Sequence, residues 1–278
     1  MPTREEEVSI HAEGRDIAGT LVSPSTLIPG VLFVHGWGGS QEQYIARARE
    51  IAALGCVCLT FDLSGHAETS PMQETVSREN NLADVLAAYD TLVRQRGVDP
   101  SSIAVVGSSY GGYLAAILTT RRPVRWLALR VPALYSDEGW THPKLQLHKE
   151  QDLRSYRRQF VAADTNRALR ACAAYDGDVL IVESERDDVI PPETITSYRE
   201  ACVKVRSLTY RCIAGADHGL TEDTSQRAYT ALLTQWLGEM LPSARRDASN
   251  AQATAAAARE GVAQASVAEQ GPETAVKP

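Results

Sequence analysis

A serine framed by two glycines is the first sign of chemistry in this chain. Residues Gly107-Ser108-Ser109-Tyr110-Gly111 form the pattern G-x-S-x-G, which follows a short apolar run and precedes a helical pattern. A sharp strand-to-helix turn at this point would present a serine hydroxyl at the carboxyl edge of a sheet, because glycines let the backbone cross closely. The pattern predicts Ser109 as a nucleophile. The Tyr110 backbone N–H would lie at a helix N-terminus, where it could stabilise an oxyanion.

With this motif, the chain resembles the α/β-hydrolase family over roughly residues 8–240. Two further segments fit the resemblance. His35-Gly36-Trp37-Gly38-Gly39 is similar to the family's oxyanion loop, which implies the backbone N–H of Trp37 as the second oxyanion donor. The stretch FDLSGH at 61–66 resembles a mainly structural family segment, in which Ala67 replaces the usual second glycine. We therefore assign no chemistry to Asp62 or His66.

A nucleophilic serine needs a general base, and the base needs an orienting carboxylate. The segment SERDDVIP at 184–191 resembles the family's G-x-x-D-x-x-V-P, with Ser184 in place of glycine. This resemblance implies Asp187 as the acid, and the adjacent Asp188 stays open as an alternative. The segment AGADHG at 214–219 resembles the loop that carries the catalytic histidine, and His218 is the only histidine after the acid.

The elements that must position these residues alternate along the chain. An N-terminal hairpin is followed by short apolar runs that suit strands buried on both faces, separated by helical patterns. We expect an α/β-hydrolase fold with a mostly parallel, doubly wound sheet of about eight strands. The strands are predicted near 8–11, 17–22, 31–34, 56–61, 103–106, 126–130, 179–183 and 207–213, and the helices near 43–54, 79–96, 111–120, 192–202 and 225–240.

One segment interrupts this alternation. Residues 132–174 contain no run typical of a buried strand and are rich in charge and aromatics, which indicates a small helical cap between core parts 1–131 and 175–241. Tyr135, Trp140 and His142 are candidate substrate contacts in this cap. Arg130, Arg157 or Arg158 could bind a substrate carboxylate. Residues 242–278 contain no aromatic and are rich in alanine, which predicts a disordered tail.

Composition excludes several classes of function. A formal net charge of −7 argues against a general nucleic-acid binder, and no signal peptide or membrane span is expected. No histidine pair has metal-ligand spacing and no nucleotide-binding motif occurs, so we expect neither a metal nor a cofactor. The five cysteines, an odd number without a CxxC pair, predict buried thiols in a reducing cytoplasm.

These observations predict a cytoplasmic serine hydrolase that cleaves a carboxylic ester of a small molecule, working as a monomer or homodimer. Thioesterase, lactonase, small peptidase or acyltransferase chemistry would use the same three side chains, so these alternatives stay open. A non-catalytic ligand binder is disfavoured because all three positions are filled. A dehalogenase would need aspartate where Ser109 stands.

Overall fold

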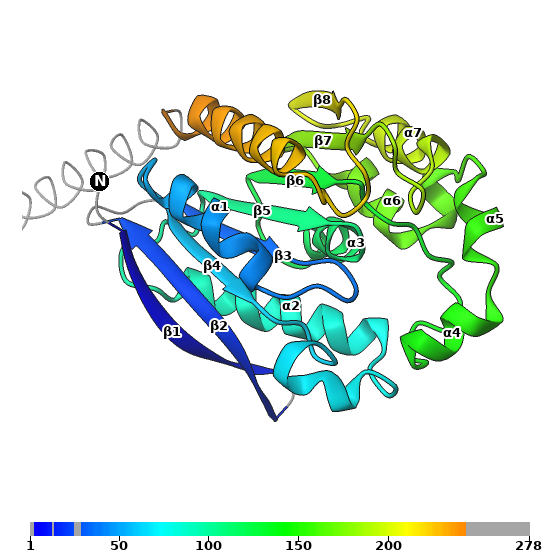
Figure 1. Ribbon diagram of the computed structural model, residues 1–278, viewed down its shortest axis with the longest axis horizontal. Coiled ribbons are helices and arrows are strands. Elements are labelled where there is room, and N and C mark those ends of the chain that lie inside the picture. The colour runs from blue at the N-terminus through cyan, green and yellow to red at the C-terminus, as the bar shows by residue number, and fades with distance from the viewer. Residues whose placement is uncertain (1–2, 13, 25–28, 243–278) are drawn as a thin grey trace, which may run out of the picture. The chain divides into compact units, whose positions relative to one another are not determined.

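The computed structural model describes residues 3–12, 14–24 and 29–242 (Figure 1). One eight-stranded sheet runs in the order β1-β2-β4-β3-β5-β6-β7-β8. β1 and β2 form an antiparallel hairpin, β2 pairs antiparallel with β4, and all later neighbours are parallel. This confirms the predicted fold class. The strands are β1 (Thr3–Ala12), β2 (Arg15–Pro24), β3 (Gly30–Val34), β4 (Val57–Phe61), β5 (Ile103–Ser108), β6 (Trp126–Arg130), β7 (Asp178–Ser184) and β8 (Ser207–Ile213).

The central strands are buried along their whole length, as continuous apolar sequences such as GVLFV, VCLTF and WLALR require. Helices cover both faces: α1 (Glu42–Ala52) and a last helix that begins at residue 223 lie on one, and α2 (Arg78–Val93) and α3 (Tyr110–Leu118) on the other (Figure 1). On the first face, the Arg47 guanidinium of α1 lies 5.0 Å from the Tyr229 ring centroid of the last helix. After β7, α7 (Pro192–Ala201) begins with a proline, as predicted.

Residues 132–174 are helical wherever they are regular. They form α4 (Lys144–Glu150), α5 (Leu153–Arg157), the short 3-10 helix η2 (Ala163–Thr165) and α6 (Arg167–Ala174). A second 3-10 helix, η1 (Ala67–Met72), follows the FDLSGH stretch and was not predicted. The role of the 132–174 segment as a cap stays a prediction.

Four of the five cysteines are buried thiols, as predicted, but Cys212 is exposed. The prediction is wrong there because Cys212 lies on β8, the outermost strand of the sheet, most of whose residues are not buried. The predicted tail lies outside the described residues from 243 onward. Within the described ranges, no helix is long and apolar enough to cross a membrane.

Candidate active site

Ser109 occupies a strained turn between β5 and α3. Its φ is 51° and its ψ is −115°, a backbone conformation with positive φ that residues other than glycine rarely adopt. Its N–H donates to the Arg130 carbonyl at 2.9 Å, and its own carbonyl accepts from Tyr113 and Ala133 N–H at 3.1 and 3.0 Å. Although Ser109 is the N-cap residue of α3, its hydroxyl makes no capping bond. The turn therefore leaves the hydroxyl free for other partners.

Glycine at position 111 lets α3 begin directly against the neighbouring strand. A Cβ atom on Gly111 would lie 2.1 Å from the Val34 carbonyl oxygen and 2.5 Å from that of His35, both of which are backbone atoms. We expect Gly111→Ala to lower the free energy of unfolding by about 3 kcal/mol or more, because no rotamer relieves such a contact. Urea unfolding would measure it.

Gly238→Ala is the matched control. Gly238 lies in the last helix and a Cβ there would meet nothing within 4 Å. This change should stabilise the fold by about 0.5–1 kcal/mol through helix propensity. Equal effects of the two substitutions would contradict the close approach at Gly111.

His218 and Asp187 complete a hydrogen-bonded chain that ends at Ser109. The His218 Nε2 lies 3.1 Å from the Ser109 hydroxyl, and its Nδ1 lies 2.8 Å from the Asp187 Oδ2. The other carboxylate oxygen of Asp187 accepts the backbone N–H groups of Val189 and Ile190 at 2.8 and 2.7 Å. The Asp187 side chain is 2% exposed and that of His218 is 23% exposed. The acid is thus buried and fixed, while the imidazole remains accessible.

These three residues come from the carboxyl ends of three strands. Ser109 follows β5, Asp187 follows β7 and His218 follows β8, and these ends share one edge of the parallel part of the sheet. Arg130, the last residue of β6, connects them: its guanidinium donates to the His218 carbonyl at 2.8 Å, and its backbone carbonyl accepts from Ser109. The predicted contact of Arg130 with a substrate carboxylate therefore competes with this structural bond.

Asp188 and Asp217, the acidic neighbours of the triad positions, face elsewhere. Asp188 is exposed, and Asp217 binds the backbone N–H and hydroxyl of Thr221 at 2.9 and 2.5 Å. Between the two sequence candidates, it is Asp187 whose carboxylate contacts the imidazole.

The loop at 35–39 lies against Ser109. A Cβ atom on Gly36 would be 3.3 Å from the Ser109 Cβ, so the backbone of this loop passes beside the nucleophile position. The next N–H, that of Trp37, donates to no acceptor among the residues that the structure describes. The Tyr110 N–H is the first of α3 and has no partner within the helix. Both predicted oxyanion donors are thus unengaged.

The FDLSGH stretch supports this loop without reaching Ser109. Asp62 accepts the Gln41 N–H at 2.8 Å, and the His66 ring packs edge-on against the Trp37 ring, with centroids 4.7 Å apart. His35 donates from Nδ1 to the Gly36 carbonyl at 2.7 Å and accepts the Leu63 N–H at Nε2 at 3.0 Å, which requires a neutral imidazole.

Burial lowers the pKa of His35 from 6.5 to about 4. Between these pH values the unfolded chain binds a proton that the folded chain does not, so stability falls as the pH falls through this window. We expect His35 to cost the protein about 2 kcal/mol of unfolding free energy between pH 7.5 and pH 5. Urea unfolding at both pH values should show this loss in wild type and a smaller one in His35→Gln. The exposed His11, changed to Gln, is the control and should keep the wild-type pH dependence.

Comparison with known proteins identifies the family. The model of the prolyl oligopeptidase family matches residues 44–244. The chain belongs to the prolyl oligopeptidase family. An uncharacterised protein of Mycobacterium tuberculosis is 26% identical over 213 residues, which are 76% of this chain and 70% of that protein.

Solved structures agree on the fold of this prolyl oligopeptidase family member. The dienelactone hydrolase of Anabaena variabilis superposes with a TM-score of 0.61 at 18% identity, over 84% of this chain and 96% of that one. Est1E of Butyrivibrio proteoclasticus, solved with ferulic acid, gives 0.65 at 18% identity, over 84% and 99%. At such identities these likenesses establish an α/β-hydrolase fold and leave the reaction open.

The three cap candidates of this family member lie in different surroundings. Tyr135 is buried, and its ring packs against Tyr110 and Tyr113 with centroids 5.6 and 5.0 Å apart. Trp140 lines a separate hollow of about 440 Å³ between α2 and α6, and His142 is exposed. Tyr135 therefore contacts Tyr110, the residue that follows Ser109. Trp140 instead lines a hollow that includes none of Ser109, Asp187 and His218.

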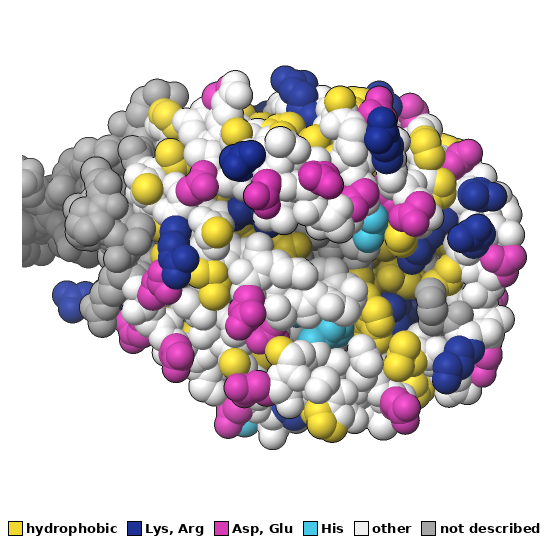
Figure 2. Space-filling model, in the orientation of Figure 1, with side chains coloured by type: hydrophobic (Ala, Val, Ile, Leu, Met, Phe, Trp, Pro, Cys, Tyr) yellow, Lys and Arg dark blue, Asp and Glu magenta, His cyan; other side chains and the backbone are white. Residues whose placement is uncertain are grey.

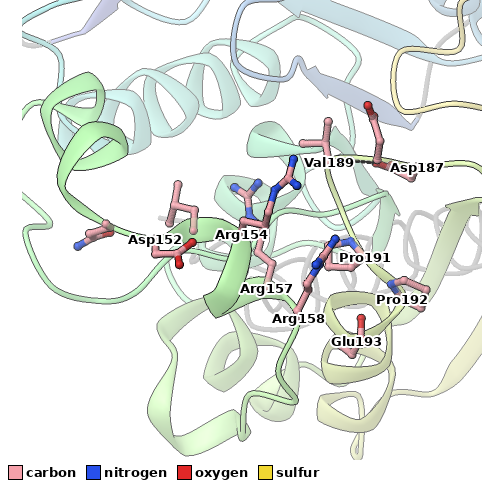
Figure 3. A pocket seen from close by; sticks show the side chains of 12 residues that line it. Asp152, Arg154, Arg157, Arg158, Asp187, Val189, Pro191, Pro192 and Glu193 are labelled. Atoms are coloured by element: carbon pink, nitrogen blue, oxygen red, sulfur yellow. Dashed lines mark hydrogen bonds between the residues drawn. The ribbon is translucent and has the colours of Figure 1, made fainter.

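A groove of about 900 Å³ runs beside the acid loop. Its α5 side carries Arg154, Arg157 and Arg158, and its other side carries Asp187, Asp188 and Glu193. Arg154 and Arg157 extend from α5 towards the loop of Asp187 and Val189 (Figure 3). In the space-filling view this face is hollowed beside a histidine, with hydrophobic and basic side chains on the side of α4 and α5 (Figure 2).

Sequence reasoning missed one buried residue at this site. Lys144, the first residue of α4, is 4% exposed and its Nζ lies 3.8 Å from the Trp37 ring centroid. No motif marks it, because its neighbours come from distant parts of the chain. The described residues contain no group of three or more His, Cys, Asp or Glu side chains that could hold a metal ion.

Proposed function

We propose that this protein is a serine hydrolase that cleaves a carboxylic ester or related acyl bond through an acyl-enzyme. The observation that carries the proposal is the hydrogen-bonded chain from the Asp187 carboxylate through His218 to the Ser109 hydroxyl, at 2.8 and 3.1 Å. The strained backbone of Ser109 and the membership of the prolyl oligopeptidase family support it. Its partner is a small acyl substrate, and the chemistry needs no cofactor.

In this mechanism Ser109 Oγ attacks the carbonyl carbon while His218 Nε2 takes the hydroxyl proton. Asp187 keeps the other imidazole nitrogen protonated and stabilises the imidazolium that forms. The Trp37 and Tyr110 N–H groups bind the tetrahedral oxyanion, each lowering the barrier by about 2.7–4 kcal/mol. His218 then gives its proton to the leaving group, and water releases the acyl group by the same steps.

Small-peptidase activity is the second candidate, because the family is named for a peptidase. An ester and an amide with the same acyl group separate the two. We expect p-nitrophenyl butyrate to be turned over and butyryl p-nitroanilide to show no turnover above background. Clear turnover of the anilide, dependent on Ser109, would make the peptidase assignment the better one.

Covalent labelling tests the nucleophile without any assumption about substrate. A fluorophosphonate should add its phosphonyl mass to the peptide that contains Ser109, and Ser109→Ala should take up none. If wild type is neither labelled nor active on ester or amide, the hydrolase proposal fails and ligand binding without turnover becomes the better account.

A further inference from the structure

Lys144 is a buried cation without a counterion. Its Nζ lies beside the Trp37, Tyr110 and Tyr135 rings, at 3.8, 4.8 and 5.1 Å from their centroids. Among the residues that the structure describes, no carboxylate pairs with it and no atom accepts a hydrogen bond from it. Contacts with aromatic faces recover only part of what a buried ammonium loses in hydration. The amine is therefore a donor that lacks an acceptor.

Two arginines add to this positive charge. The Arg78 and Arg157 guanidinium carbons lie 5.8 and 4.9 Å from the Tyr135 ring centroid, and both side chains are buried. Arg78 donates to the carbonyls of Ser136 and Glu138, and Arg157 to that of Leu134 at 3.1 Å. Carbonyl oxygens satisfy donors without cancelling charge. We call Arg78, Lys144 and Arg157 the cation cluster.

Asp137, an acidic side chain of the 132–174 segment, is already engaged by other arginines. Asp137 pairs with Arg167 at 3.4 Å and with Arg170 at 2.7 Å. Glu138 meets Arg78 through its backbone carbonyl. In the described part of the chain, no carboxylate forms an ion pair with the cation cluster. A ligand could supply the missing anion.

The electrostatics of Lys144 agree with this geometry. Burial, together with the charges of Arg157 and Arg78, lowers the pKa of Lys144 well below its ordinary value of 10.5. The other titratable groups that face it are Tyr110, Tyr135 and His66, and the lysine charge in turn helps to lower the pKa of His66. None of these groups is an anion at neutral pH. An arriving anion would raise the lysine pKa and stabilise the charged form of the amine.

The position of the amine says which part of a substrate would meet it. Lys144 contacts the side chains of Trp37 and Tyr110, the two residues whose N–H groups are the oxyanion donors in the proposed mechanism. The leaving group must depart towards His218, which protonates it. A group beside Lys144 therefore belongs to the acyl part of the substrate.

We propose that Lys144, with Arg78 and Arg157 beside it, binds a carboxylate carried by the acyl part of the substrate. A carboxylate suits the single ammonium, which has no acceptor, whereas both Arg78 Nη atoms and the Arg157 Nε already donate to carbonyls. The Arg78 Nε has no hydrogen-bond partner among the described residues. The protein then prefers half-esters of short dicarboxylic acids to neutral esters of equal length. This assignment of substrate class rests on the proposed hydrolase function.

A pair of matched esters tests the preference. Mono-p-nitrophenyl glutarate should have a kcat/KM about ten- to hundredfold above that of p-nitrophenyl valerate in wild type. Lys144→Met keeps the length of the side chain and removes the charge, so the ratio of the two kcat/KM values should fall to about one. Lys149→Met, on the exposed side of the same helix, is the control and should keep the wild-type ratio.

The pH dependence gives a readout that a packing role for Lys144 would not produce. The ratio of kcat/KM values should decline as the pH rises, because the amine loses its proton, and Lys144→Met should abolish this decline. The melting temperature of Lys144→Met should equal or exceed that of wild type, because the variant removes a buried unpaired charge.

Binding without turnover separates this proposal from the hydrolase proposal. Glutarate should bind Ser109→Ala in calorimetry, and binding should be lost when Lys144→Met is added. Such binding supports the carboxylate site even if both esters resist hydrolysis, an outcome that would count against the hydrolase function alone. Equal kcat/KM values for the two esters with no glutarate binding would overturn the carboxylate site and leave the hydrolase function standing.

Discussion

Ser109→Ala is expected to lower kcat for ester hydrolysis by about 10⁶-fold, because among the described residues no other hydroxyl is hydrogen-bonded to the His218 Nε2. The residual rate would come from substrate binding and the oxyanion donors. Steady-state kinetics on p-nitrophenyl butyrate, with a sensitive background correction, measures the loss. The melting temperature should change little, because alanine keeps the same backbone conformation and the change removes one hydrogen bond to a partly exposed imidazole.

Ser108→Ala is the matched control, because Ser108 precedes Ser109 in the same motif and is also a serine. Its buried hydroxyl oxygen accepts a hydrogen bond from the Arg130 Nε at 3.4 Å. We expect kcat to fall by less than about tenfold, since a hydrogen bond of this length contributes little. A larger loss of kcat in Ser108→Ala than in Ser109→Ala would show that Ser108, and not Ser109, is the nucleophile.

Asp187→Asn is expected to lower kcat by about 10⁴-fold. One carboxylate oxygen of Asp187 accepts from His218, and the other accepts two backbone N–H groups. An amide has one acceptor oxygen, so its NH₂ group must face either the imidazole or the two N–H groups. The backbone pair holds the oxygen, which turns the NH₂ towards His218 Nδ1. The imidazole then carries its proton on Nε2 and cannot accept one from Ser109.

Asp188→Asn separates this effect from a general loss of charge in the loop. Asp188 is adjacent, carries the same charge and is exposed. We expect kcat within about threefold of wild type, since an exposed charge interacts weakly with its surroundings. If the two substitutions exchanged effects, Asp188 would be the orienting acid and the proposed chain of hydrogen bonds would be wrong.

Much of the fold followed from local patterns. Strands β6 and β8 have the predicted bounds, and the other predicted elements lie within about three residues of theirs, because continuous apolar runs and helical spacing are local properties of the chain. β1 is the exception, because it begins at Thr3, five residues before its predicted start. The motif order placed Ser109, Asp187 and His218 after three different strands. Since parallel strands end at one edge of the sheet, this order also predicted that the three residues would lie together.

Other features depended on which segments pack against each other. Cys212 is exposed because β8 lies at the edge of the sheet, and a short apolar strand does not reveal its place in the strand order. Tyr135, Trp140 and His142 share a segment of eight residues, yet the structure directs them to the core, to a separate hollow and to the surface. Irregular segments have no period from which the direction of a side chain could be predicted.

The sequence by itself determined the individual strands, the strand-to-helix turn and the types of residue that follow the strands, because each depends on neighbours close in the chain. Only the tertiary structure decided that Asp187 rather than Asp188 contacts His218, since adjacent residues differ in direction and not in type. It alone brought Lys144 among Trp37, Tyr110 and Tyr135. The pKa and the binding role of a buried charge depend on its neighbours, and the neighbours of Lys144 come from segments that meet only when the chain folds.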